Sequence, residues 1–274
     1  MDSKKECLCI GLYIQVGEKM IERFKKYHFL FQILVKRDFA KKYNRTVLGA
    51  FWSMLTPLMM VSAQAVIFTH FFGRTQPHFI VYMFIGNIIF GFFRDATTNG
   101  MMAIESNAGI VTKIRVPMYL FIFSRNITAL INMLLTLIVL VIFCIADNVP
   151  LTLHWLLLIY PVSCLMVFNI GIGMLLSGIY VFFRDTRYFY DIFCTILMYF
   201  SAIFYTVSSF PDKIAWLFNV NPVFTYISYT RKLIINAEVP SLQHTLLCFG
   251  YAVVALGVGC LMYYKKNRSY VYNL

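Results

Sequence analysis

The sequence predicts an all-α integral membrane protein with six transmembrane helices, an N-terminal amphipathic interface helix and an external re-entrant helical segment before the last span. Composition is the first observation behind this fold class. Of the 274 residues, 60% are hydrophobic and only 13% are charged, whereas soluble domains are about half apolar and about a quarter charged. The second and third observations are long uncharged stretches and a clustering of basic residues in particular loops. Together they exclude an ordinary soluble enzyme, a disordered tail, a disulfide scaffold and a nucleic-acid-binding domain.

Uncharged stretches give the predicted spans, because a helix needs about 20 apolar residues to cross the hydrocarbon core. A shorter uncharged run at 214–230 contains Asn221 and Pro222, so we interpret residues 208–235 as the re-entrant segment. Pro211 and Pro222 break helix continuity there, and Asn221 directly precedes Pro222. The six predicted spans cover residues 50–72, 79–98, 118–146, 153–182, 189–207 and 245–264.

Basic residues predict the orientation, because short cytoplasmic loops carry an excess of Lys and Arg. Residues 1–46 contain eleven of the 24 basic residues, and the connections 99–117 and 183–188 and the C-terminal tail add seven more. The opposite side contains only Arg74, Lys213, Arg231 and Lys232. Both termini are therefore expected in the cytoplasm, and the net charge of +12 is mainly an orientation signal.

The N-terminal region, residues 1–46, is expected to lie at the membrane surface, ahead of a domain at 47–274 that contains the six predicted spans. In residues 18–43, Phe24, Phe31 and Leu34 recur near helical spacing, while basic residues occupy other faces. Such a helix lies in the headgroup plane of a membrane. The alternative is a soluble helix packed on another protein.

Several catalytic devices are missing from the sequence. There is no phosphate-binding loop, so the chain cannot bind ATP in that way, and no metal site or catalytic motif is evident. The seven cysteines are scattered, and ionisable residues do not lie deep in the predicted spans. Ion-coupled carriers usually need such residues near the midplane. The energy for transport is therefore expected from a partner chain, and this chain is expected to hold no cofactor.

Three short motifs occur in order over roughly residues 30–235. They are Arg37-Asp38 followed by Lys42-Tyr43, Leu48-Gly49, Trp52 and Pro57; Lys113-Ile114-Arg115-Val116-Pro117; and Phe183-Arg184-Asp185-Thr186 followed by Asn221-Pro222, Tyr229 and Arg231. Together these motifs resemble the polysaccharide-export permeases, which are type-2 ABC exporters of O-antigen, teichoic acid and capsule. One position departs from the family pattern: the fifth span often has Thr/Ser-Pro, and here the residues are Ser201-Ala202.

The resemblance implies a non-enzymatic transmembrane subunit that exports a lipid-linked polysaccharide across the bacterial cytoplasmic (inner) membrane. Its expected partners are a second copy of itself, two nucleotide-binding subunits that hold ATP and Mg, an undecaprenyl-linked glycan and membrane lipid; nucleic acid is not expected. Two alternatives are a type-2 permease for a small molecule, such as a drug or a lipid, and a polytopic glycan-processing enzyme. The enzyme would need acidic or His residues clustered at one face, and the sequence has no such cluster.

The resemblance also implies roles for particular residues, each of which has a simpler structural alternative. The connection 99–113 is expected to be the helix that couples to the ATPase, rather than a plain loop, through Glu105, Asn107, Ile110 and Lys113. Basic residues before the first span are expected to meet the diphosphate of the substrate, although membrane anchoring explains most of them. The residues of this substrate entry are Lys42, Arg45, Leu48, Gly49 and Trp52. The re-entrant segment is expected to act as an external gate, with Pro211, Asn221 and Pro222 as its residues.

Aromatic residues make up 18% of the chain and are candidates for a sugar-stacking passage. The alternative is an interfacial belt with lipid-facing packing. The candidate channel residues are Phe68, Phe72, Tyr188, Tyr190, Phe193, Tyr199, Phe200, Phe204 and Tyr205. Glycines in the fourth and sixth predicted spans are expected to allow close packing between helices. They are Gly171, Gly173, Gly178, Gly257 and Gly259.

Overall fold

A computed structural model of the chain describes residues 27–41, 49–71, 77–113, 116–207, 218 and 220–272; within these, the side chains of 50, 53, 68–71 and 266–272 are not described. All regular secondary structure in these ranges is helical, including residues 27–41. The elements are η1 (Gly49–Phe51), α2 (Trp52–Phe71), α3 (Phe79–Met101), η2 (Glu105–Asn107), α4 (Ala108–Val111), α5 (Tyr119–Ala146), η3 (Leu153–Leu158), α6 (Ile159–Tyr180), α7 (Thr186–Phe200), α9 (Pro222–Ile234) and α10 (Leu242–Tyr272).

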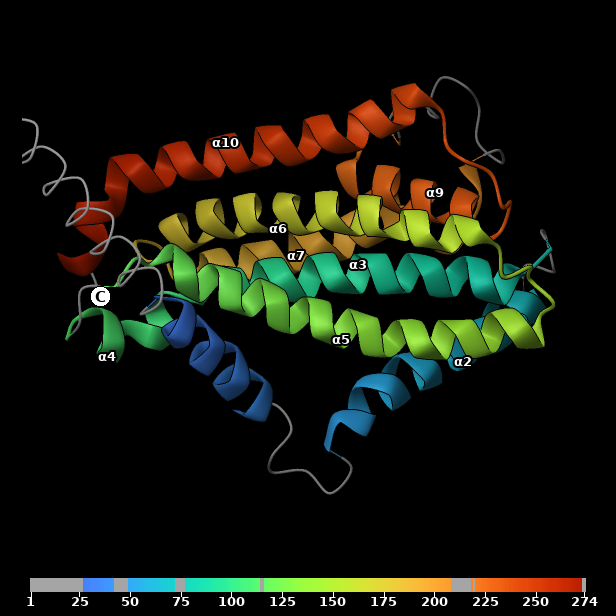
Figure 1. The fold of residues 1–274 in the computed structure, drawn as a ribbon, viewed down its shortest axis with the longest axis horizontal. Helices are drawn as coiled ribbons and strands as arrows, with labels where there is room; N and C mark the ends of the chain where they lie inside the picture. Colours follow the sequence, from blue (N-terminus) through green and yellow to red (C-terminus); the bar gives the residue numbers. More distant parts are fainter. Residues whose placement is uncertain are drawn as a thin grey trace, which may run out of the picture.

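The long helices run side by side along the long axis of the molecule (Figure 1). The central helix, α3, packs against α5 and α6, and α10 lies along the outer side of α6. The helix at residues 27–41, the short α4 and the C-terminal end of α10 gather at one end of the bundle, which we call the terminal end (Figure 1). The short helix α9 lies at the opposite end, which we call the far end.

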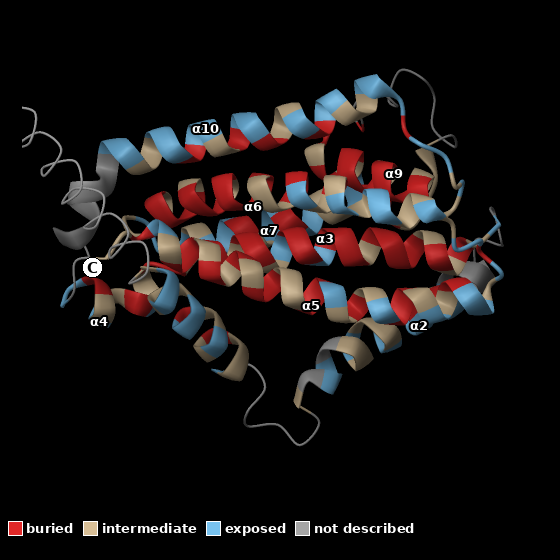
Figure 2. Cartoon of the chain, viewed as in Figure 1, coloured by how far each residue is buried: buried red, intermediate tan, exposed pale blue. Residues whose placement is uncertain are grey.

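Burial identifies α3 as the core of the bundle. In the most apolar 18-residue stretch of α3, 67% of the residues are buried, whereas the corresponding share in α10 is 22%. Figure 2 shows the same contrast. Adjacent residues Phe92 and Phe93 are both buried, so the helix is covered on more than one side. A helix that is apolar around its circumference belongs in an interior, and this explains the position of α3.

Glycines bring α6 and α10 into backbone contact. A Cβ atom added at Gly171 would overlap the backbone of Ala255, and one added at Gly259 would overlap the backbone of Gly171. A Cβ added at Gly173 would lie 3.6 Å from the Cα of Gly100 on α3. The expected close contact is thus confirmed at these positions, whereas a Cβ at Gly257 would meet nothing within 4 Å.

Four helical segments in the described part of the chain are long and apolar enough to cross a membrane: Phe79–Met101, Tyr119–Ala146, Leu153–Tyr180 and Leu242–Lys265. Their outward faces carry exposed aliphatic residues, as on α5 at Ile138, Ile142 and Ile145. Such faces require a lipid environment, and the chain is a multi-pass membrane protein.

The remaining two predicted spans correspond to α2, whose bounds Trp52–Phe71 lie close to the predicted 50–72, and to α7, which differs from the prediction. In α2 the described apolar stretch is Met54–Ile67, and the side chains that flank it, at residue 53 and at residues 68–71, lie outside the described ones. Helix α7 has 15 residues and ends at Phe200 rather than at residue 207. The chain leaves the helix at Ser201, and Ala202 adopts a left-handed φ of 47°.

Asparagines explain two of the helix boundaries. Asn148 has a φ of 56° and follows α5, while the Val149 N–H donates to the Cys144 carbonyl at 2.9 Å. Asparagine tolerates this left-handed conformation better than most residues, so it commonly ends a helix. At the start of α9, the Asn221 side chain accepts from the Val223 N–H at 3.0 Å, and Pro222 occupies the first turn.

Candidate translocation and coupling sites

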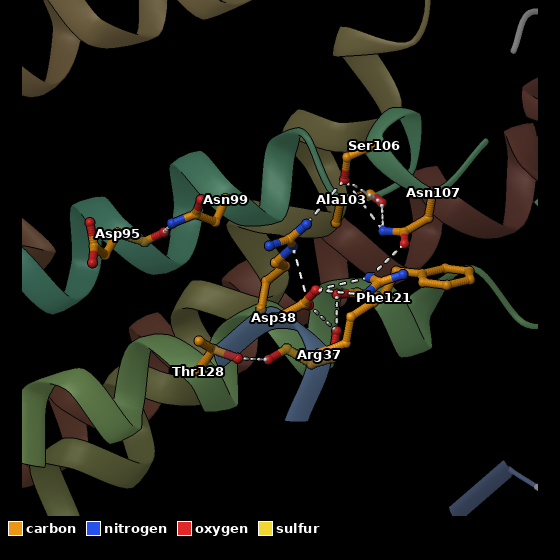
Figure 3. A network of polar contacts seen from close by, with 11 residues as sticks. Arg37, Asp38, Asp95, Asn99, Ala103, Ser106, Asn107, Phe121 and Thr128 are labelled. Atoms are coloured by element: carbon orange, nitrogen blue, oxygen red, sulfur yellow. Dashed lines mark hydrogen bonds and ion pairs between the residues drawn. The ribbon is translucent and has the colours of Figure 1, made fainter. Parts of the chain in front are cut away.

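A network of charged and polar groups joins three segments at the terminal end (Figure 3). Asp38, on the helix at 27–41, is almost completely buried. Its carboxylate pairs with Arg37 at 2.9 Å and with Arg125 of α5 at 3.4 Å, and it accepts from the Ser124 hydroxyl at 3.3 Å. A buried carboxylate with two cations and a hydroxyl is well compensated, so this network fixes the N-terminal helix to α5.

The connection between α3 and α5 is held by the same network. The Arg37 guanidinium donates to the Asn107 side-chain oxygen at 2.7 Å, and the Asn107 amide donates to the Ala103 carbonyl at 2.7 Å. Nearby, Glu105 pairs with Arg184, which precedes α7, at 3.3 Å. The connection is therefore tied to the N-terminal helix on one side and to the start of α7 on the other.

The four residues predicted to couple to an ATPase have different surroundings. Lys113 is exposed, whereas Ile110 is half-buried and packs on a cluster that includes Leu34 and Phe121. Glu105 is half-buried, and Asn107 is buried and faces inward. The α3 helix includes residues 99–101, so the short helices η2 and α4 make up the helical part of the predicted coupling region. Its exposed residues are Ser106, Gly109, Thr112 and Lys113.

Of the predicted entry residues, Gly49 and Trp52 lie in the described part, and Lys42, Arg45 and Leu48 lie outside it. Gly49 has a φ of 49°, a left-handed conformation that favours glycine, so the expected turn occurs there. Trp52 is exposed and lines a cleft of about 510 Å³ between α2, α3 and α5. Five of the lining residues are polar although the cleft lies between apolar helices: Thr56, Asn87, Asp95, Asn132 and Thr136.

Helix α7 presents a row of exposed aromatic side chains. Tyr188, Phe189 and Phe193 are 70%, 73% and 52% exposed, and Tyr199 and Phe200 continue the row at 57% and 49%. The row covers almost the full length of the helix. Ile192, Thr195 and Ile196 are also exposed between these aromatic residues. The surface is therefore aromatic toward both ends of the helix and mixed in the middle, and we call it the α7 aromatic face.

Other predicted channel aromatics do not join the α7 aromatic face. Tyr190 is buried on the opposite side, where its hydroxyl donates to the Thr97 hydroxyl at 2.6 Å. Phe204 and Tyr205 are half-buried beyond the end of α7, and Phe204 packs on the core. The Phe68 side chain and residue Phe72 lie outside the described residues.

The non-helical segment after α7 is held by two residues from α9 and its cap. Arg231 is 94% buried, and its guanidinium donates to the carbonyls of Ala202 at 3.0 Å and Ile203 at 3.3 Å. It also donates to the Tyr82 carbonyl at 3.2 Å and stacks on the Tyr82 ring at 3.4 Å. We call this arrangement the Arg231 clamp.

Asn221 contributes from the cap of α9, where its amide donates to the Phe200 carbonyl and the Ser201 hydroxyl, both at 3.1 Å. The predicted gate residues Asn221 and Pro222 thus meet the end of α7. Pro211 lies outside the described residues.

Sequence reasoning missed Asp38, Arg125 and Tyr82 as functional positions. A signal existed for Asp38, because it follows Leu34 by four residues and therefore lies on the same helical face. Leu34 and Asp38 are indeed both buried. No comparable signal marks Tyr82, whose role depends on a contact with Arg231 across 149 residues of sequence.

Comparison with known proteins gives relatives over most of the chain. The O-antigen export system permease protein RfbA of Klebsiella pneumoniae is 24% identical over 247 residues, covering 88% of this chain and 95% of the relative. RfbA of Myxococcus xanthus is 22% identical over 256 residues, covering 92% and 98%. The polysialic acid transport protein KpsM of Escherichia coli is 23% identical over 244 residues, covering 87% and 93%.

A family profile described as ABC-2 type transporter matches residues 29–235. The match begins at the N-terminal helix and ends directly after α9. It therefore includes the terminal network, the α7 aromatic face and the Arg231 clamp. The chain belongs to the ABC-2 type transporter family.

Proposed function

We propose that this chain is the transmembrane subunit of an ATP-driven exporter that moves a lipid-linked polysaccharide across the bacterial cytoplasmic membrane. Relatives named for O-antigen export and polysialic acid transport support the substrate class. The carrier lipid is expected to be undecaprenyl. ATP and Mg are expected on a separate nucleotide-binding subunit.

The observation that carries this proposal is the α7 aromatic face. Exposed residues on α5 are aliphatic, at Leu134, Ile138 and Ile142, which suits contact with lipid tails. Exposed residues on α7 include five aromatic residues between Tyr188 and Phe200, together with Ile192, Thr195 and Ile196. Aromatic rings stack on the apolar faces of sugars, and tyrosine adds a hydrogen-bonding group. This contrast favours a sugar-conducting surface on α7 over a lipid-facing one.

The working unit in this proposal contains two copies of the chain and two ATPase subunits. Two α7 aromatic faces then enclose one passage, and α2 and α7 complete six spans in each copy. Both termini, the helix at 27–41 and the connection 102–113 face the cytoplasm. Movement of the ATPases reaches the spans through that connection, because Glu105 and Asn107 join it to the start of α7 and to the N-terminal helix.

A permease for a small molecule, such as a drug or a lipid, is the second candidate. The cleft beside Trp52 favours it, because about 510 Å³ falls within the range of small-molecule sites. Small-molecule export predicts that substitution of cleft residues such as Asn132 abolishes transport while the α7 aromatic face tolerates change.

Deletion of the gene tests the proposal. The expected result is loss of the surface polysaccharide and accumulation of undecaprenyl-linked glycan inside the cell, measured by gel analysis of extracted glycolipid. The wild-type chain and an Ile142→Ala variant on the lipid-facing side of α5 restore export, whereas the double variant Phe193→Ala, Tyr199→Ala restores it poorly. Unchanged surface glycan in the deletion strain would overturn the proposal.

A further inference from the structure

A pocket of about 400 Å³ lies beside the Arg231 clamp at the far end of the bundle. It is lined by residues that include Tyr82, Phe224, Ser228, Arg231 and Lys232. Asn236 also lines it and is exposed, so the pocket is open to the outside of the molecule. The pocket is separate from the α2–α3–α5 cleft.

The pocket carries two positive charges that no described carboxylate neutralises. No described acidic residue forms an ion pair with Arg231 or Lys232 within 4.0 Å, and none lines the pocket. Three carbonyl groups and an aromatic ring stabilise the Arg231 guanidinium. These groups are neutral, so the positive charge of Arg231 is not cancelled. A charge removed from water acts more strongly on its neighbours than an exposed one. The pocket is therefore strongly attractive to an anion.

The position of these two cations is unusual for this chain. Of its 24 basic residues, only four lie on the predicted non-cytoplasmic side, and two of those four, Arg231 and Lys232, line this one pocket. The positive-inside bias removes basic residues from that side. Orientation therefore does not explain this pair.

The neutral lining residues resemble those of a sugar site. Tyr82 and Phe224 offer aromatic rings that can cover the apolar face of a pyranose. Ser228 and Asn236 offer a hydroxyl and an amide, and neither side chain hydrogen-bonds to another described residue. A pocket of this volume has room for one sugar unit but not for a polymer.

We infer that this pocket binds the carboxylate-bearing sugar of an acidic glycan as the glycan leaves the passage. The inference rests on the proposed export function and narrows its substrate class to anionic polysaccharides. Lys232 pairs directly with the carboxylate, since its side chain is only half-buried. Arg231 supplies the buried positive field behind it.

The test uses the purified full-length chain in phosphatidylcholine nanodiscs, with glucuronate and glucose as probes and saturation-transfer NMR as the readout. Glucuronate is expected to bind with a Kd of roughly millimolar order, and Lys232→Gln is expected to weaken it at least about tenfold, as for loss of a charged hydrogen bond. Lys232→Arg should preserve binding. Lys36→Gln, a matched change of an exposed lysine at the terminal end, should leave it unchanged.

Three results would overturn the inference. The first is equal affinity for glucuronate and glucose, and the second is equal glucuronate affinity in wild type and Lys232→Gln. The third comes from a parallel preparation with phosphatidylglycerol added to the nanodiscs, in which Lys232→Gln changes the retention of that lipid alone. The last result would assign the pocket to a lipid headgroup. If deletion blocks glycan export but glucuronate binding fails this test, only the acidic-sugar inference is lost. If deletion leaves export intact, the proposed function fails first.

Discussion

Asp38 and Arg231 are the buried charged residues in the described part of the chain, and they are compensated in different ways. Asp38 faces two formal positive charges, whereas Arg231 faces carbonyl dipoles and the Tyr82 ring. Removing a member of a buried ion network leaves its partners uncompensated, which costs more than the pairing itself contributes. Substitutions at the two sites should therefore act through different neighbours.

Asp38→Asn should destabilise the terminal end, because Arg125 loses its counter-ion in a largely buried position. We expect a loss of about 3 kcal/mol in stability. Thermal unfolding followed by a thiol-reactive dye measures it, since buried Cys144, Cys164, Cys194 and Cys248 become reactive on unfolding. Asp185→Asn, at an exposed acidic position, is the control and should leave the midpoint unchanged. An equal midpoint in both variants would contradict the role of Asp38.

Gly86→Ala should disturb the Arg231 clamp, because the added Cβ would lie 2.8 Å from the Arg231 Nη2 atom and 3.1 Å from Ile203. Overpacking of this kind costs about 1–3 kcal/mol. On the same helix, Gly91→Ala meets nothing within 4 Å and should stabilise α3 by up to about 1 kcal/mol through helix propensity. The dye-based unfolding assay should therefore shift in opposite directions for the two variants, and a parallel shift would refute the expected clash.

At the scale of elements, α6 and α10 depend on a contact that only glycine permits. Gly171→Ala and Gly259→Ala should each separate the two helices and lower the unfolding midpoint, at a cost of about 1–3 kcal/mol. Gly257→Ala has open space around its added Cβ and serves as the matched control on α10. If all three variants behaved alike, close packing would not explain the glycines.

The ion pair between Glu105 and Arg184 connects the 102–113 region with the start of α7. In the complete exporter, Glu105→Arg should reduce substrate-stimulated ATP hydrolysis severalfold, because like charges then face each other across this joint. The charge-reversed double variant Glu105→Arg, Arg184→Glu should recover part of the activity. Absence of any recovery would mean that Glu105 acts through another partner.

Long apolar helices could be predicted from sequence, but the break after α7 could not. The predicted spans 118–146 and 153–182 match α5 and the η3–α6 segment closely, because charged or polar residues border these runs. No proline or glycine marks the end of α7 at Phe200. That end is held by Asn221 and Arg231, which follow 20 to 30 residues later, so it depends on tertiary contacts. The pairing of Glu105 with Arg184 could not be predicted either, because it also depends on a tertiary contact.

At the scale of the whole molecule, the α7 aromatic face is a large apolar surface that the single chain leaves uncovered. In the proposed homodimer, this face lies near its counterpart in the second copy. Ile192→Cys, 59% exposed on α7, should then form a disulfide-linked dimer on oxidation in membranes, in a background without Cys7, Cys9 and Cys260. Ile142→Cys is equally exposed on α5, at 60%, and should remain monomeric. Electrophoresis without reductant distinguishes them, and dimers from both would indicate random collision.

The short length of α7 has a consequence for the work of moving a polar polymer. Fifteen residues at about 1.5 Å each give a helix of about 22 Å, well below the roughly 30 Å of the hydrocarbon core. Beyond Phe200 the main chain turns away, and polar groups begin there. In the proposed export, a polymer moving along α7 would therefore cross a thinner desolvating layer than the surrounding bilayer presents, and each sugar unit would spend fewer steps without hydration.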